Sequence, residues 1–350
     1  MTPLRDTFAA FRAENPKTRI RTAAQELGVS EAALVATGVD GEAVRLRPDF
    51  EEILLELEAL GPLMALTRND ACVHEKTGVY DDVTTGMAHR IAQVLGGDID
   101  LRLFLGRWRH AFAVATPWDG GADGFRRSLQ FFDAHGDAVH KVFATRKTDL
   151  DAFLGLVARF TAEEAEAPTF EPRPEPAAVR PDAEVDADAL LTDWAALQDT
   201  HDFFQLLRTH DVARTQALRL AEGRFTERVE AGAARAVLQA AAEAEAPIMV
   251  FVGNRGCVQI HTGPVNKLVE HGPWYNVLDP GFNLHLDETR IAEAWVVVKP
   301  TEDGDVTALE LYDAEGDQIV QFFGERKPGK AERADWRAIV AGLPRLEPVA

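Results

Sequence analysis

One histidine, His201, has a spacing that could place it where chemistry is possible. In the segment 190–208, large apolar residues recur at intervals of four, three and seven: Leu190, Trp194, Leu197 and Phe204. This spacing predicts one helix with an apolar face, and His201 falls on the same face. A core histidine hydrogen-bonded to a backbone carbonyl is the commoner outcome at such a position. The alternative is a ligand to a metal or to haem iron, because neutral imidazole binds iron and Trp194 and Phe204 would supply the apolar wall that a porphyrin needs. The segment alone favours the core histidine.

Few other motifs suggest a reaction. The chain has no phosphate-binding Gly-Lys-Ser/Thr loop, no Gly-x-Ser-x-Gly nucleophile motif and no His-Glu-x-x-His zinc motif. The remaining histidines are scattered: His74, His89, His110, His135, His140, His210, His261, His271 and His285. None has the spacing of a metal site. His135 and His140 flank a predicted turn, where surface exposure is expected.

Composition limits the class of protein. The chain has 350 residues, 46% hydrophobic and 27% charged, which is typical of a soluble globular protein large enough for two domains. With 37 Lys and Arg against 57 Asp and Glu, its net charge is -20. This charge disfavours nucleic acid and anionic membranes as partners. No signal peptide and no membrane-spanning apolar run is apparent, so we expect a cytoplasmic protein without membrane insertion. Two cysteines, Cys72 and Cys257, fit a reducing compartment and cannot form a zinc site by themselves.

The second half of the chain repeats the first. The segment 62–78 aligns with the segment 247–263 at a constant offset of 185. Its matched residues include Asn69 with Asn254, Cys72 with Cys257, Thr77 with Thr262, and Gly78 with Gly263. Further matches follow at offsets of 183 and 180: Arg107 with Arg290, Phe132-Asp133 with Tyr312-Asp313, and Arg146-Lys147 with Arg326-Lys327. Small changes in offset are expected from insertions in loops.

Each repeat is predicted to be α+β, with a large antiparallel sheet and flanking helices. Runs of strand-forming residues separated by Gly, Asp and Pro occupy 111–116, 294–299, 309–312 and 319–323. Helical patterns cover 49–60, 149–160 and 330–343. Strands that follow strands argue against a doubly wound parallel sheet. We predict a first repeat over 1–160, an acidic proline-rich linker over 161–188 and a second repeat over 189–350.

The segment 20–34 has the small residue, the turn glycine and the apolar spacing of a DNA-binding helix-turn-helix. Against DNA binding are the net charge, an acid after the turn (Glu31), and a partial echo in the second repeat, where Arg21 aligns with Arg214 at an offset of 193. The segment is therefore interpreted as part of the repeat, and no nucleic-acid partner is expected.

Several motifs together resemble one family. They are the two-fold repeat, the segment 194–214 with its histidine, Asp100-Leu-Arg-Leu-Phe104, Val296-Val-Val-Lys-Pro300 and Val320-Gln-Phe-Phe-Gly-Glu-Arg326. In these features the chain resembles the bacterial cytoplasmic haem-utilisation proteins of the HemS/HmuS type, known as hemin-degrading or hemin-transport factors. The resemblance covers nearly the whole chain, and its motifs occur in the family's order.

The resemblance implies a haem b (iron protoporphyrin IX) held between the two repeats. It implies His201 as the axial iron ligand and Arg102 as a distal residue that reaches the iron through water. The remaining residues that it places in the pocket are Phe104, Phe204, Arg214, Lys299, Gln321, Phe323 and Arg326. Cations at one edge would suit the propionates, and aromatic rings would suit the macrocycle. Phe104, Phe204 and Phe323 could equally be ordinary core, and Arg214 an ordinary ion pair.

The repeat also indicates that the two halves are not equivalent. His201 falls opposite Phe8 and Arg102 opposite His285, so we expect one haem per chain. Two functions remain open. The favoured one is a carrier that receives imported haem and delivers it for iron release, with a haem oxygenase or reductase as a candidate partner. The alternative is an enzyme that degrades haem with an external reductant and oxygen or peroxide.

Overall fold

The computed structural model describes residues 3–86, 88–121, 123–163, 167–175, 178–327 and 329–346. Within the chain there are two compact units. Unit 1 comprises residues 1–68, 75–174 and 254–259, and unit 2 comprises residues 69–74, 175–253 and 260–350. The domain boundaries predicted at 160 and 188 stay predictions, and residues 164–166 and 176–177 of the predicted linker lie outside the described residues, as do the two ends of the chain.

Each unit contains one short segment from the other half of the sequence, and an asparagine holds that segment. In unit 2, Asn69 Oδ1 accepts hydrogen bonds from the N–H groups of Ala71 and Cys72, while its Nδ2 donates to Ile319 O at 2.7 Å. In unit 1, the side chain of Asn254 makes the same pattern of bonds, with Nδ2 donating to Val139 O at 2.9 Å. The two asparagines matched by the repeat therefore hold the inserted segment of each unit through equivalent hydrogen bonds.

The strands form two antiparallel nine-stranded sheets with matching strand orders, β1-β7-β8-β9-β2-β3-β15-β14-β13 and β10-β16-β17-β18-β11-β12-β6-β5-β4. In the first sheet the strands are β1 (Glu42–Leu46), β2 (Leu63–Arg68), β3 (Cys72–Gly78), β7 (Trp108–Pro117), β8 (Phe125–Asp133), β9 (Ala138–Ala144), β13 (Leu268–His271), β14 (Trp274–Asp279) and β15 (Phe282–Asp287). In the second they are β4 (Val83–Thr84), β5 (Ile91–Leu95), β6 (Asp100–Phe104), β10 (Thr226–Val229), β11 (Ile248–Gly253), β12 (Cys257–Gly263), β16 (Glu293–Lys299), β17 (Val306–Tyr312) and β18 (Gln318–Gly324). The predicted α+β class with a tandem repeat is confirmed.

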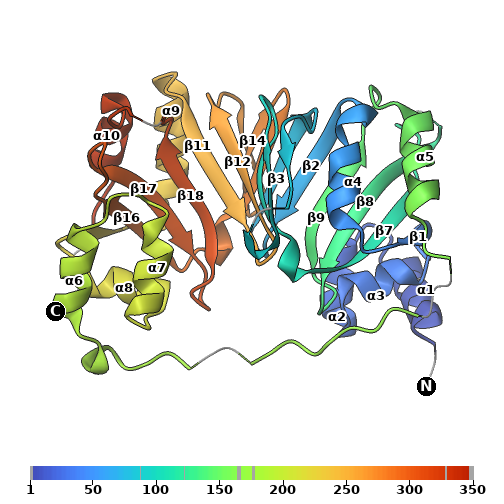
Figure 1. Cartoon of the computed structure of the whole chain (residues 1–350), viewed down its shortest axis with the longest axis horizontal. Coiled ribbons are helices and arrows are strands. Elements are labelled where there is room, and N and C mark those ends of the chain that lie inside the picture. Colours follow the sequence, from blue (N-terminus) through green and yellow to red (C-terminus); the bar gives the residue numbers. More distant parts are fainter. Residues whose placement is uncertain are drawn as a thin grey trace. The chain divides into compact units, whose positions relative to one another are not determined.

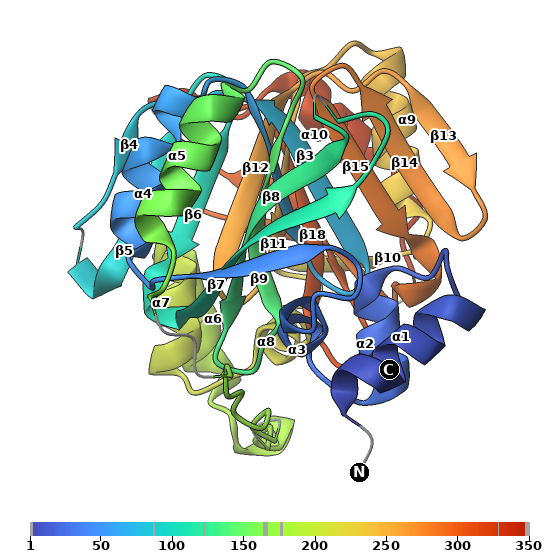
Figure 2. The same cartoon turned by 90° about the vertical axis from the view of Figure 1, so that its right-hand side faces the viewer.

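Unit 1 places two groups of helices on its strands. Helices α4 (Phe50–Glu56) and α5 (Leu150–Phe160) lie side by side and pack on a core that includes Trp108 and Phe131 (Figure 2). The short helices α1 (Leu4–Glu14), α2 (Ile20–Leu27) and α3 (Glu31–Ala36) form a separate group that buries Phe8. Asp149 begins α5, because its side chain accepts a hydrogen bond from the N–H of Ala152.

Unit 2 repeats this arrangement. Helices α9 (Ala233–Glu243) and α10 (Ala334–Ala341) pack on one apolar core, and α6 (Ala187–Ala195), α7 (Asp202–Thr209) and α8 (Arg214–Leu220) pack on another (Figure 1). Alternation along β16 separates the two cores, since Trp295 and Val297 face α6–α8 while Val296 faces α9 and α10. This division places the segment around His201 on one face of the unit 2 strands.

The helix-turn-helix pattern at 20–34 is a real turn between α2 and α3. Gly28 ends α2 in the left-handed region, at φ +66°, where glycine carries no steric cost. On α3 the residues Glu31, Ala32, Leu34 and Val35 are buried. The second helix of the pattern thus packs inside unit 1. Across the described residues, no helix combines the length and the apolar character needed to span a bilayer.

Candidate functional site

The imidazole of His201 is exposed at the start of α7. Its side chain is 90% exposed, and the residue precedes Asp202, the first residue of the helix. The expectation of one helix over 190–208 is wrong, because α6 ends at Ala195 and α7 begins only at Asp202. His201 therefore lies on no apolar helix face, and the simpler interpretation of a buried core histidine is wrong as well.

Asp199 causes this interruption and also fixes the histidine. Its Oδ1 accepts the backbone N–H of His201 at 2.8 Å, a local bond that competes with helix formation. The same oxygen lies 2.6 Å from His201 Nδ1. These bonds from His201, the backbone bond above all, lower the pKa of Asp199. A carboxylate can only accept, so Nδ1 is the donor in this contact, and in the neutral ring the lone pair belongs to Nε2.

The aromatic residues near α7 are arranged differently from the expectation. Phe204 is 65% exposed, whereas its neighbour Phe203 is only 1% exposed. It is Phe203 that meets Trp194, with ring centroids 4.6 Å apart in an edge-to-face contact. Trp194 is fully buried. Only Phe204 therefore offers a ring to a ligand from this segment.

Two of the expected cationic residues are held by a buried carboxylate, Glu310 on β17. Arg214 Nη2 donates to Glu310 Oε1 at 2.8 Å, and Lys299 Nζ donates to the same oxygen at 2.9 Å. Tyr312 OH also donates to the carboxylate, as does Gln321 Nε2, at 2.8 Å. We call Glu310, Arg214, Lys299, Tyr312 and Gln321 the Glu310 cluster.

The electrostatics of the Glu310 cluster are those of a compensated ion group. Burial by itself would raise the pKa of Glu310, but the charges of Arg214 and Lys299 hold it far below its ordinary value. Burial lowers the pKa of Lys299 to about 8, although attraction to Glu310 opposes this shift. Arg214 was expected either at the propionates or in an ordinary ion pair, and the ion pair is what it makes.

The Glu310 cluster also anchors α7. The Phe203 ring lies between its two cations, with Lys299 Nζ at 4.6 Å and Arg214 Cζ at 5.0 Å from the ring centroid. Such cation–π contacts are stronger when they are removed from water. Since Phe203 is two residues from His201, the cluster fixes the start of the helix that carries the histidine.

Strand β18 contributes a partly exposed aromatic surface on the same face as Gln321. Phe323 follows Gln321 by two residues, so both point to one side of the strand. The Phe323 ring packs edge-to-face on Phe251 of β11, with centroids 5.0 Å apart. Beyond the strand, Arg326 lies within electrostatic reach of Asp199, and its Nε is buried without a hydrogen-bond partner among the described residues. Arg326 is thus the expected cation that the structure brings towards the histidine.

Arg102 and Phe104 belong to unit 1 and are considered within that unit alone. Both lie on β6 at alternate positions, so their side chains share one face, and both are partly exposed. The guanidinium of Arg102 pairs with Asp100 and donates to Leu101 O at 3.2 Å. The motif 100–104 therefore presents a cation and an aromatic ring together.

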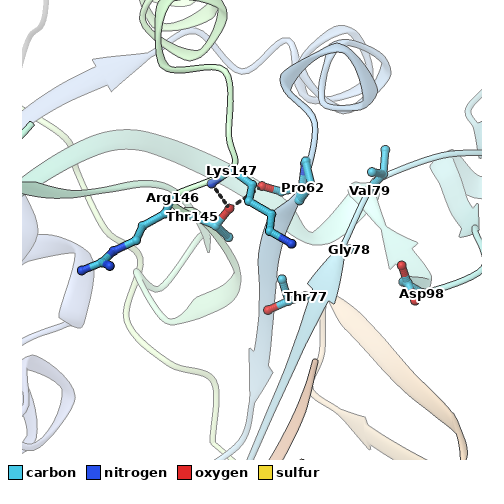
Figure 3. Close-up of a pocket in the computed structure, with 8 residues that line it drawn as sticks. All are labelled: Pro62, Thr77, Gly78, Val79, Asp98, Thr145, Arg146 and Lys147. Atoms are coloured by element: carbon cyan, nitrogen blue, oxygen red, sulfur yellow. Dashed lines mark hydrogen bonds between the residues drawn. The ribbon is translucent and has the colours of Figure 1, made fainter. Parts of the chain in front are cut away.

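In the first repeat, the dipeptide Arg146-Lys147, matched to Arg326-Lys327, borders a cavity of about 410 Å³. Figure 3 shows the Lys147 side chain directed towards Thr77 and the Arg146 side chain directed away from it. Asp98 lies on the opposite side of the view. This cavity offers an amine, hydroxyls and a carboxylate, but no imidazole or thiolate, so it has no strong ligand for iron.

The donor set around His201 suits a metal that is already chelated. Among the described residues, no group of three or more His, Cys, Asp or Glu side chains is placed to hold a metal ion. A single imidazole binds a bare ion weakly, but it is sufficient as the axial ligand of an iron held by a porphyrin. The exposed ring of Phe204 and the partly exposed ring of Phe323, with Arg326 near the histidine, fit an apolar disc that carries carboxylates.

Sequence reasoning missed Asp199, Glu310 and Phe251. A signal existed for Asp199, because an Asp two residues before a polar residue favours a turn that interrupts a helix. Glu310 gave no comparable signal, since one acid within an apolar strand is recognisable only after the cations that surround it are known.

The comparisons with known proteins agree along the chain. The model of the haemin-degrading HemS/ChuX domain matches twice, over residues 28–160 and 211–343. The hemin transport protein HmuS of Yersinia pestis is 41% identical over 338 residues, which cover 96% of each chain. The crystal structure of holo-PhuS, a heme-binding protein from Pseudomonas aeruginosa, is similar with a TM-score of 0.93 and 51% identity, covering 98% of this chain and 99% of that one. ChuS, described as an E. coli heme oxygenase, is similar with a TM-score of 0.85 and 39% identity over 96% of this chain and 99% of its own.

Proposed function

The chain belongs to the haemin-degrading HemS/ChuX family, and on that premise we propose that it binds haem through His201 and delivers it for iron release. One observation carries this proposal. The His201 ring is exposed, and its Nδ1 is occupied by Asp199, which directs Nε2 outward. A metal-binding histidine commonly donates its second ring N–H to a carboxylate, which fixes the ring and raises the basicity of the ligand nitrogen.

The other residues are assigned by their surroundings. Phe204 and Phe323 contact the macrocycle, and Arg326 binds a propionate. Arg214 and Lys299 act chiefly through the Glu310 cluster, which holds Phe203 and therefore α7, and Gln321 links that cluster to β18. The parts proposed for Arg102 and Phe104, on the distal side of the iron, rest on the resemblance of the motif 100–104.

The proposed cargo is haem b, and the proposed handover is to a haem oxygenase or a reductase-dependent partner. A carrier needs a site that keeps free haem low and still releases it. A single exposed histidine satisfies both needs, because one coordination bond and stacked rings bind haem without enclosing it. The similarity to HmuS, a hemin transport protein, supports this carrier role.

The experiment is a hemin titration of the whole chain with His201→Ala beside His210→Ala. The wild type should give a Soret band of a histidine-ligated haem, and His201→Ala should shift that band and weaken binding on the order of 100-fold. His210 is the matched control, because it lies at the other end of α7 and pairs with Asp193 through Nε2 at 2.8 Å. An unchanged spectrum and affinity in His201→Ala would remove the histidine from the site.

A second candidate function is haem degradation, favoured by the similarity to ChuS, described as a heme oxygenase. In this function haem is the substrate and brings the iron at which oxygen reacts, while His201 holds it from one side and leaves the opposite side open. Incubating the haem complex with a reductant, with and without catalase, separates the functions. A defined tetrapyrrole and released iron in the presence of catalase indicate an enzyme. Bleaching that occurs only without catalase indicates damage by peroxide.

A further inference from the structure

Unit 2 contains a second concave region, on the face of β16 opposite to α7. A cavity of about 300 Å³ is formed between the segment 223–227, which leads into β10, strands β16 and β17, and helix α10. Its floor includes Val296 and Val298, which alternate with Val297 and Lys299 along the strand. Since Val297 packs with α6–α8 and Lys299 contacts Phe203 of α7, the cavity is a different site from that of His201.

The floor and one wall of this cavity are apolar. Val296 and Val340 are buried, at 3% and 2% exposure, and Val298 is half-buried. Ala341, the last residue of α10, lies at the rim. A volume near 300 Å³ is at the lower end of the range for small-molecule sites, so it fits a ligand of a few carbon atoms.

Three arginines border the same cavity: Arg224, Arg337 and Arg345. Arg345 already has partners within the protein. Its Nε pairs with Glu227 at 2.7 Å, and its Nη1 donates to the carbonyl oxygens of Val340 and Leu343 near the end of α10. Arg224 lies over the Phe225 ring, 5.1 Å from the centroid. Neither Arg224 nor Arg337 makes a side-chain hydrogen bond or an ion pair with another described residue.

The local charge departs from that of the chain. The whole protein carries a net charge of -20, yet the cavity is bordered by three guanidinium groups and one carboxylate, Glu227. The next carboxylate within electrostatic reach of Arg337 is Glu332, whose pKa is raised by its own burial. A concentration of cations over an apolar floor attracts an anion that also carries an apolar body.

We propose that this cavity binds a small amphipathic carboxylate, whose head lies between Arg224 and Arg337 and whose chain lies on Val296, Val298 and Val340. Guanidinium groups donate paired hydrogen bonds that match the geometry of a carboxylate. The valines account for the preference for an apolar chain over a bare anion, because a bare anion would leave them in contact with water.

The test is calorimetric titration of the full chain with hexanoate, with hexanol and inorganic phosphate as comparison probes. Hexanoate should saturate one site and bind at least about tenfold more tightly than either comparison probe, because hexanol lacks the charge and phosphate lacks the chain. The proposal is overturned if hexanoate does not saturate a site. It is also overturned if phosphate binds as tightly as hexanoate.

Three variants locate the site. Arg224→Gln and Arg337→Gln should each weaken hexanoate binding about tenfold, because each removes a charge-assisted bond. Ala341→Phe should block the cavity without removing a charge, and it keeps the test informative if an arginine variant misfolds. Arg219→Gln is the control, because Arg219 lies on α8 and pairs with Asp182 at 3.4 Å. Equal binding by all four variants would place the hexanoate elsewhere and overturn the assignment.

Discussion

The turn before α7 and the turn before α2 occupy equivalent positions in the two halves, and their residues differ. The family model matches residues 28–160 and 211–343, 183 positions apart, so α2 corresponds to α7 and Thr18 to His201. The expected match of His201 with Phe8 was wrong, because Phe8 lies within α1, which corresponds to α6. His201 is 90% exposed and is bonded to Asp199, whereas the position that matches Asp199 is Pro16, which has no carboxylate. The comparison teaches that a repeat can keep a turn before a helix while one half adds an imidazole and the carboxylate that holds it.

The interiors of the two units differ in polarity at one set of matched positions. In unit 1, His140 is bonded through Nδ1 to Thr67 Oγ1 at 2.9 Å and through Nε2 to Tyr80 OH at 2.8 Å, and Cys257 Sγ lies 3.2 Å from Thr67 Oγ1. At the matched positions unit 2 has only apolar side chains and a thiol: Val252, Val265, Val320 and Cys72. At these matched positions unit 1 therefore has a buried hydrogen-bonded network, where unit 2 has apolar packing around a thiol.

Both units also bury a carboxylate between an arginine and a lysine. In unit 1, Glu31 pairs with Lys141 and lies 3.9 Å from Arg21. In unit 2, Glu310 serves Arg214 and Lys299 at closer range, with further bonds from Tyr312 and Gln321. The matched ranges 28–160 and 211–343 align Glu31 with Arg214, so the carboxylate and the arginine come from different elements in the two units. Both ion groups therefore neutralise a buried carboxylate, but Glu310 accepts more hydrogen bonds than Glu31.

The largest expected effect is on stability, and it tests this inequality. Glu310→Gln should lower the free energy of unfolding by about 3–5 kcal/mol, because it leaves two buried cations without their counter-ion. Glu31→Gln should cost less, because Lys141 donates a hydrogen bond to that carboxylate while Arg21 lies at the longer distance of 3.9 Å. Urea unfolding midpoints of the two variants and the wild type measure the difference. Equal midpoints for the two variants would mean that the two ion groups contribute alike.

The second effect is a pH dependence specific to unit 1. Burial lowers the pKa of His140 to about 3 from an ordinary value of 6.5. Because the folded state keeps the ring neutral while the unfolded state binds a proton below pH 6.5, stability falls as the pH falls from 6.5 to about 3. The loss is about 1.4 kcal/mol per pH unit in that window. His140→Val, which copies the residue at position 320, should flatten the profile.

Unfolding free energies measured between pH 7 and 4 check this prediction, with His135→Gln as the control. His135 is partly exposed, and its Nδ1 lies 3.2 Å from the Glu171 carbonyl oxygen, so its variant should keep the wild-type slope. If His140→Val keeps the same slope, the acid sensitivity arises from other groups. The exposure expected for His140 from its position beside a turn was wrong, because the strand β9 carries it into the core.

Much of the fold was predictable, because matched segments of a repeat are expected to form the same helices and strands. Alternating strand residues and punctuating glycines gave the α+β class and the strands around β16–β18. The helix at 190–208 was predicted wrongly, since the apolar spacing continues from Trp194 through the turn and gives no sign of the break. That break depends on the side chain of Asp199, which binds the backbone N–H of His201.

The candidate site was predictable only in part. The resemblance singled out His201, Arg326 and Phe323, whose surroundings suit a ligand. It could not separate Arg214 and Lys299 from them, because a guanidinium that binds a buried carboxylate and one that awaits a propionate have the same sequence signature. The distinction requires the position of Glu310, which is distant in sequence from both Arg214 and His201.

The third effect concerns haem and the carboxylate of Asp199, whose matched position in the first repeat is Pro16. Asp199→Asn should weaken hemin binding about tenfold, because an amide accepts the Nδ1 proton less strongly and the ring loses its fixed direction. It should also raise the ferric–ferrous midpoint potential, since a less basic imidazole stabilises the ferric iron less. Hemin titration measures the affinity, and spectroelectrochemistry of the haem complex measures the potential. An Asp199→Asn complex with wild-type affinity and potential would reduce the aspartate to a local turn former.

The smallest effect separates an exposed ring used for binding from one that is merely exposed. Phe204 in unit 2 and Leu55 on α4 in unit 1 are 65% and 51% exposed. Neither Phe204→Ala nor Leu55→Ala should change the unfolding free energy by more than about 0.5 kcal/mol, because little area is buried at either site. Hemin affinity should fall about two- to tenfold in Phe204→Ala, the range expected for one stacked ring, and stay unchanged in Leu55→Ala. Equal affinity in the two variants would mean that Phe204 is exposed for another reason and that α7 contributes only its histidine to the haem site.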